Sequence, residues 1–159
     1  VPPLMLALLA NDRAVDVSPE RIRVTFHETG RAARFYLDVR EDLSTTLRPR
    51  PLRLEKLWTA CIAPVVDALE ASGDINGKLI WSNTGYLVNW FLGEMREPLG
   101  EAQYHALRHA CFFDAQLSDG RDNPLYRTVV PRNGLLVRRT CCQRNRLPGV
   151  QQCGDCTLK

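Results

Sequence analysis

The chain has 159 residues, of which 45% are hydrophobic and 25% charged, a composition typical of a globular domain. Its apolar runs fall well short of the roughly 20 residues that a membrane-spanning helix needs. Residues 121–159 hold seven arginines and one lysine against two aspartates, so this stretch carries +6 while the whole chain carries +3. No Gly-rich phosphate loop, Ser–His–Asp set or dinucleotide fingerprint occurs, which argues against nucleotide-dependent and serine-hydrolase chemistry.

The first fifty residues predict a short helix followed by a β-hairpin. Pro2 to Ala10 is apolar but lacks the basic segment of a signal peptide, and we expect it to form a helix or a buried arm. Ile22, Val24 and Phe26 alternate with polar residues, as in a half-buried strand. Residues 33–39 are expected to return as the partner strand.

Residues 51–117 predict three helices. The first has an apolar stripe and an expected kink at Pro64. The stripe consists of Leu54, Leu57, Trp58, Cys61, Ile62, Val65, Val66 and Leu69. Ser82-Asn83-Thr84 is expected to cap a second helix. Its apolar positions are Leu87, Val88, Phe91, Leu92 and Met95. The third helix is expected to run from Glu101 to about Gln116 and to bury Leu107, Cys111 and Phe112.

Two histidines on the third predicted helix, His105 and His109, have a spacing that can place two imidazoles on one metal ion. No glutamate or third ligand is expected beside them. We therefore interpret them as ordinary core or surface polar residues.

The last part of the chain predicts a second hairpin that leads into a cysteine-rich tail. Leu125 to Val130 and Leu135 to Arg138 are expected to pair across Asn133-Gly134, the strongest short turn signal for a hairpin. The second strand runs almost directly into Cys141, which gives a rigid lead into the tail.

Four of the six cysteines lie within sixteen residues of this tail, as Cys141-Cys142, ten intervening residues, and Cys153-x-x-Cys156. Four thiolates that close together suit one Zn²⁺ ion or an iron–sulfur cluster. A disulfide knot and thiols without a ligand are the alternatives. Neighbouring residues of an extended chain point in opposite directions, which suits one tetrahedral ion poorly and favours a two-iron cluster.

The other two cysteines, Cys61 and Cys111, lie in apolar helical patterns and are interpreted as buried thiols. The tail cysteines are then a ligand set rather than disulfide partners. This interpretation predicts a reducing compartment, the cytoplasm.

The tail resembles that of the siderophore-iron reductases of the ferric hydroxamate uptake type. The resemblance covers roughly the second half of the chain. It rests on the cysteine pattern, on Arg138-Arg139 before it, on Arg144 and Arg146-Leu147-Pro148 after the adjacent pair, and on Trp81-Ser82-Asn83 upstream. Asn145 stands where an aromatic residue is typical of the family, and part of the family's N-terminal region is expected to be missing.

The resemblance implies that Cys141, Cys142, Cys153 and Cys156 hold a [2Fe–2S] cluster. The implied activity is a ferric-siderophore reductase that passes one electron to a ferric siderophore, of the hydroxamate type, and releases Fe²⁺ in the cytoplasm. An electron-donor protein such as a ferredoxin is the implied partner. No nucleic acid is expected, and contact with the inner membrane is at most peripheral.

Basic and aromatic side chains near the site have predicted roles. Arg138, Arg139, Arg144 and Arg146 are expected to offset the negative charge of the cluster or to dock an acidic donor protein. Trp81 is expected to contact the organic chelate. Two other functions remain open: a zinc-folded module with a basic nucleic-acid- or partner-binding face, and a non-catalytic iron–sulfur protein.

The predicted fold class is α+β. We expect a mainly helical single domain with an N-terminal hairpin region (1–50), a helical core (51–117), and a basic hairpin with a cluster-binding tail (121–159).

Overall fold

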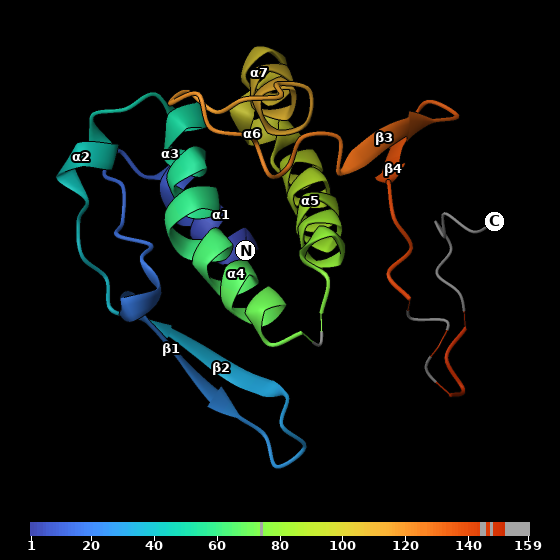
Figure 1. Ribbon diagram of the computed structural model, residues 1–159. Coiled ribbons are helices and arrows are strands. Elements are labelled where there is room, and N and C mark those ends of the chain that lie inside the picture. The colour runs from blue at the N-terminus through green and yellow to red at the C-terminus, as the bar shows by residue number, and fades with distance from the viewer. Residues whose placement is uncertain (74, 144–145, 147, 152–159) are drawn as a thin grey trace. The chain divides into compact units, whose positions relative to one another are not determined.

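The computed structural model describes residues 1–73, 75–143, 146 and 148–151 (Figure 1). Helices dominate it, and two antiparallel two-stranded hairpins complete it, which confirms the predicted α+β class. Contacts divide the chain into two compact units. The N-terminal unit is Pro3–Ala68, and the C-terminal unit is Leu69–Lys159 together with Val1–Pro2. Within the described residues, none of the helices combines the length and apolar character required to cross a bilayer.

The N-terminal unit contains most of α1, the first hairpin and a long interrupted helix. Its elements are α1 (Pro2–Ala10), the 3₁₀ turn η1 (Pro19–Arg21), β1 (Ile22–Phe26), β2 (Ala32–Leu37), α2 (Leu43–Thr46), α3 (Arg50–Lys56), the π-helical turn η2 (Leu57–Ile62) and the start of α4 (Ala63–Ala71). α1 begins on two prolines, which suit a first turn whose N–H groups have no partner inside the helix.

The interrupted helix departs from the prediction in its second half. The Ala63 N–H donates to the Trp58 carbonyl five residues earlier, so the irregularity expected at Pro64 takes the form of a π-helical turn just before it. One extra residue rotates everything after it by about 100°. Val65 and Leu69 are therefore exposed, contrary to the predicted apolar stripe, while Val66 is buried.

A buried arginine on α3 ties the loops of the N-terminal unit together. Arg53 donates from Nε to the Arg48 carbonyl at 3.0 Å and from Nη1 to the Asn11 carbonyl at 2.9 Å. Its Nη2 reaches the carbonyls of Asp12 at 3.1 Å and Thr46 at 2.7 Å. The planar guanidinium thus satisfies four backbone acceptors at once, which no other side chain can do in this geometry.

The first hairpin pairs as predicted but is less buried than expected. Val24 lies opposite Phe35, and the register shifts between Thr25 and Phe26. Phe26 was expected on a half-buried face, but it is 68% exposed. A two-stranded ribbon has no second layer of its own to cover the end near its turn.

The C-terminal unit is built around a long helix. Its elements are α5 (Gly77–Glu94), α6 (Arg96–Leu99), α7 (Glu101–Phe112), β3 (Val129–Arg132) and β4 (Leu135–Arg138). α5 contacts α7 and both strands of the second hairpin (Figure 1). This helix therefore supports the segment that leads into the cysteine tail.

The start of α5 differs from the prediction. Asn76 is the N-cap, and its side-chain oxygen accepts from the Lys78 N–H at 2.9 Å. The Glu70 carboxylate accepts from the Gly77 N–H at 2.7 Å. With two N-terminal donors satisfied there, the helix begins before Ser82-Asn83-Thr84, which lies in its interior and caps nothing. Leu87, expected in the apolar stripe, is exposed.

α7 ends at Phe112, four residues before the predicted end, because a side chain satisfies its last carbonyls. The buried Asn123 amide donates to the carbonyls of Ala110, Cys111 and Asp114 at 3.0, 3.2 and 2.9 Å. Its oxygen accepts from the Leu125 N–H at 3.0 Å. The predicted burial of Leu107, Cys111 and Phe112 is confirmed.

The second hairpin has the predicted turn. Asn133 and Gly134 have φ of 50° and 78°, the left-handed values that a two-residue turn requires. Arg132 pairs with Leu135 across this turn, so Pro131 and Leu136 form the next, non-hydrogen-bonded pair. Pro131 therefore needs no backbone N–H for the pairing of the two strands. The first strand begins at Val129 rather than at Leu125.

Candidate metal centre

The adjacent cysteines lie just beyond the second hairpin. β4 ends at Arg138, and Cys141 and Cys142 follow, both half-buried. Cys153, Cys156 and Arg144 lie outside the described residues. Cys61 and Cys111 are buried in the helices, as predicted. Burial raises the pKa of the Cys61 thiol, which disfavours the thiolate that a metal ligand needs.

The backbone after the adjacent pair directs a donor at sulfur. Gln143 has φ of 59°, in the left-handed region that non-glycine residues rarely adopt. In this conformation its N–H donates to Cys141 Sγ at 3.3 Å. Backbone N–H groups aimed at sulfur stabilise the thiolate and tune metal–thiolate centres. The chemistry of this pair therefore fits a thiolate-bound cluster, and the four-cysteine ligand set stays a prediction.

One face of α5 holds the strand that leads into the cysteines. Arg138 Nη1 donates to Asn83 Oδ1 at 2.9 Å, and its guanidinium carbon lies 4.8 Å from the centroid of the Tyr86 ring. The Thr140 N–H donates to Ser82 Oγ at 3.4 Å. We call Ser82, Asn83 and Tyr86 the α5 anchor. The α5 anchor contacts Arg138 and Thr140, and Thr140 directly precedes Cys141.

A glycine allows this close approach. A Cβ atom on Gly85 would lie 2.7 Å from the Thr128 Cβ atom, well inside van der Waals contact. The Thr128 carbonyl in turn accepts from the Arg139 N–H at 2.9 Å. We call Thr128, which directly precedes β3, the β3 lead. The α5 helix and the β3 lead fit together only without a side chain at position 85. Sequence reasoning missed Gly85 and Thr128, although an isolated glycine inside a helical pattern is a signal of close packing.

The other predicted site residues have different environments. Arg138 is only 8% exposed, whereas Arg139 and Arg146 are exposed. Arg146 Nη1 contacts Gln143 Oε1 at 3.3 Å. Trp81, half-buried, precedes the α5 anchor on the same helix.

The two histidines of α7 are exposed and lie beside carboxylates. His105 Nε2 is 3.2 Å from Glu101 Oε2, and His109 Nδ1 is 3.0 Å from Asp114 Oδ1. The expectation that no glutamate lies near them was therefore wrong, because Glu101 is one helical turn before His105. Across the part of the chain that the structure describes, no three histidine, cysteine or acidic residues gather to hold a metal ion.

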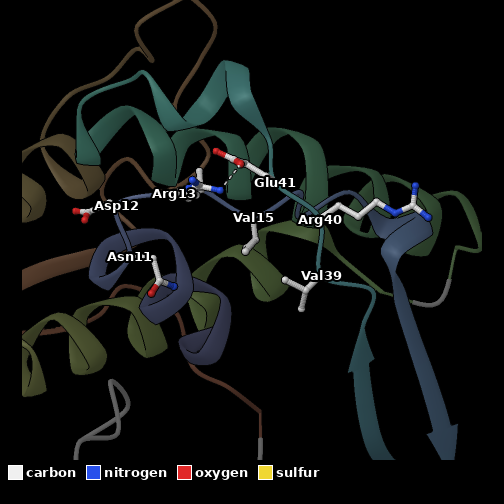
Figure 2. Close-up of a pocket in the computed structure, with 8 residues that line it drawn as sticks. Asn11, Asp12, Arg13, Val15, Val39, Arg40 and Glu41 are labelled. Atoms are coloured by element: carbon white, nitrogen blue, oxygen red, sulfur yellow. Dashed lines mark hydrogen bonds and ion pairs between the residues drawn. The ribbon is translucent and has the colours of Figure 1, made fainter.

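A shallow groove of about 470 Å³ lies in the N-terminal unit (Figure 2). Arg13 Nη1 and Glu41 Oε2 are 3.3 Å apart along it, while the Arg40 side chain extends away from this pair. Val15 and Val39 contribute apolar surface. Its lining includes no cysteine and no histidine, so the groove has no soft metal ligands.

Comparison with known proteins identifies the family. Residues 1–136 match the family described as "Ferric iron reductase FhuF-like transporter". The chain belongs to this family. Residues 138–158, which include all four tail cysteines, match the "FhuF 2Fe-2S C-terminal domain". The resemblance inferred from the cysteine spacing is thereby confirmed, and so is the [2Fe–2S] cofactor of this domain, against structural zinc.

A curated relative is similar over the whole length of this chain. The chain is 64% identical over all of its 159 residues to the "Ferric siderophore reductase" of Escherichia coli (strain K12). It spans 61% of the length of that protein.

Proposed function

We propose that this chain carries the cluster-bearing part of a ferric-siderophore reductase. The observation that supports this most strongly is the 64% identity over the whole chain to a protein named for that activity. A ferric siderophore holds Fe³⁺ with hard oxygen ligands, and Fe²⁺ fits these ligands far less well. One electron therefore suffices to release the iron, and the reaction needs neither a nucleophile nor a general base.

The proposed ligands are Cys141, Cys142, Cys153 and Cys156. When bound, a [2Fe–2S] cluster supplies electrons one at a time. The hydrogen bond from the Gln143 N–H to Cys141 supports the assignment for the first ligand. The spacing Cys-x₁₀-Cys-x₂-Cys after the adjacent cysteines supports it for the other three.

The arginines around the site divide into two proposed roles. Arg138 is nearly buried against α5, so it offsets negative charge at the site rather than docking a partner. Arg139 and Arg146 are exposed and are available, with Arg144, to attract an acidic electron-donor protein such as a ferredoxin. Trp81, half-buried on α5 directly before the anchor, is proposed to contact a hydroxamate-type chelate. The reaction is proposed to take place in the cytoplasm.

The proposal is tested on the purified chain with a ferric hydroxamate siderophore, a chemical reductant and a coloured Fe²⁺ chelator. The wild-type protein should contain iron and acid-labile sulfide, show visible absorption that bleaches on reduction, and accelerate Fe²⁺ release. Cys153→Ala should abolish both the absorption and the acceleration. Cys61→Ala, which removes a buried thiol outside the tail, is the matched control and should keep both.

Two results would overturn the proposal. Stoichiometric zinc in a colourless protein would remove the iron–sulfur centre. A coloured protein that reduces and reoxidises normally but leaves the rate of Fe²⁺ release unchanged would point to the non-catalytic iron–sulfur alternative.

A further inference from the structure

The contacts of α5 with residues 138–140 point to a role for that helix at the cluster itself. The inference rests on the proposed ligation by the tail cysteines. We infer that the α5 anchor is a positioning site for the cluster: Asn83 fixes the Arg138 charge and, with Ser82, the start of the cysteine pair. It thereby sets both how firmly the cluster is held and its reduction potential.

The backbone just before Cys141 is held in place by hydrogen bonds. Each of the three residues before Cys141 makes a hydrogen bond to α5 or to Thr128. The Arg138 side chain is bound by Asn83, the Arg139 N–H by the Thr128 carbonyl, and the Thr140 N–H by Ser82. The contacts of Arg138 and Thr140 join segments 55 and 58 residues apart, and the Arg139 contact continues the pairing of the hairpin, so the strand end cannot shift without breaking them.

The charge of Arg138 is buried and fixed in position. Arg138 is only 8% exposed, so solvent screens its charge weakly. Its position is fixed from two sides, by the Asn83 carbonyl oxygen at 2.9 Å and by the face of the Tyr86 ring at 4.8 Å. It lies three residues before the first cysteine.

A fixed positive charge beside a cluster affects electron transfer. A thiolate-bound [2Fe–2S] cluster is negatively charged, and reduction adds one more negative charge. A fixed cation nearby stabilises the reduced form more than the oxidised form, which raises the potential. An oxygen that holds Arg138 in place therefore acts on the cluster through Arg138.

Two substitutions separate position from charge. Asn83→Ala removes the acceptor, so Arg138 loses its hydrogen bond to α5 and keeps the contact with the Tyr86 ring. Asn83→Asp has the same shape and still accepts from Arg138, but its carboxylate cancels the charge of the guanidinium. Asn89→Ala is the matched control. Asn89 lies on the same helix and makes no side-chain hydrogen bond to the described residues.

The experiment measures two quantities on the wild-type chain and the three variants. The first is the rate at which an iron chelator removes the chromophore, and the second is the midpoint potential from a redox titration followed by visible absorption. Asn83→Ala should lose the chromophore about tenfold faster, the effect of one lost hydrogen bond to a charged group. Asn83→Asp should keep the wild-type rate but titrate at a lower potential. Asn89→Ala should match the wild type in both.

A purely structural role for Asn83 would leave the potential of Asn83→Asp at the wild-type value, and that result would overturn the inference. If Asn83→Ala does not fold, Asn83→Asp alone decides the question. These readouts need no siderophore, so a failure here with normal Fe²⁺ release would leave the proposed function standing. A colourless wild-type protein would overturn both.

Discussion

Replacing Gly85 by alanine is the sharpest test of how α5 supports the cysteine tail. The new Cβ atom would lie 2.7 Å from the Thr128 Cβ atom, where carbon atoms normally stay about 3.5–4.0 Å apart. Both residues are buried, so the clash cannot be relieved into solvent. We expect Gly85→Ala to push the β3 lead away from α5.

The magnitude follows from two opposing effects. Overpacking of this kind costs about 1–3 kcal/mol, and the higher helix propensity of alanine returns about 0.5–1 kcal/mol. The net loss of about 1–2 kcal/mol lowers Tm by about 2–8 °C for a chain of this size. Circular dichroism on heating measures it directly.

Gly93 supplies the matched control. It lies on the same helix, and a Cβ atom there would meet no other atom within 4 Å. Gly93→Ala should therefore raise Tm by about 1–4 °C through reduced backbone entropy of the unfolded chain. The two alanine substitutions thus have opposite predicted signs.

A double-mutant cycle identifies the partner. Thr128→Gly removes both the Cβ and the hydroxyl that the new methyl would meet, so it should rescue Gly85→Ala, with a coupling energy of about 1–3 kcal/mol. Thr128→Ala should rescue it less, because the Cβ atom remains. If Gly85→Ala and Gly93→Ala stabilise the protein equally, the close approach of α5 to Thr128 does not exist.

Three further substitutions test the two units. Asn123→Ala should lower the free energy of unfolding by about 2–4 kcal/mol, because the buried amide satisfies three carbonyls at the end of α7 and one N–H. Urea denaturation measures this loss, and Asn11→Ala, an exposed amide with one hydrogen bond, should cost less than about 0.5 kcal/mol. Arg53→Lys should cost about 2–4 kcal/mol, since an ammonium group cannot reach the four carbonyls that the guanidinium binds; an unchanged urea midpoint would contradict this role. The Ser18 backbone N–H donates to Asp16 and holds the pKa of that carboxyl below its usual range, so the carboxylate stabilises the fold above pH about 4 and ceases to do so as pH falls through the folded pKa. The stability difference between the wild type and Asp16→Asn should accordingly shrink as the pH is lowered below about 4. A constant difference from pH 7 to pH 2 would refute the stabilising role of the Asp16 carboxylate.

Features that depend on neighbouring residues could be predicted from the sequence. The Asn133-Gly134 turn has the expected left-handed φ values because only a few residue types adopt them at low cost. The cysteine spacing limited the metal chemistry to zinc or an iron–sulfur cluster, because the number and identity of the thiols act before any folding is considered. The family resemblance implied the [2Fe–2S] cofactor, and the match to the family's C-terminal domain confirms it. The periodic pattern also predicted the buried residues Leu107, Cys111 and Phe112 of α7, but on α5 it predicted only Val88, Phe91 and Leu92 correctly.

What the tertiary structure alone decided depends on residues distant in sequence. Ser82-Asn83-Thr84 looked like a helix cap, because the local pattern cannot tell a cap from an interior residue whose partner lies elsewhere. The structure shows that Asn83 accepts from Arg138, 55 residues further on, while Asn76 caps the helix. Gly85 likewise acquires its meaning only from Thr128. The sequence by itself predicted the ligand set and determined the turn at Asn133-Gly134, and long-range packing decided which side chains hold the chain just before the cysteine pair.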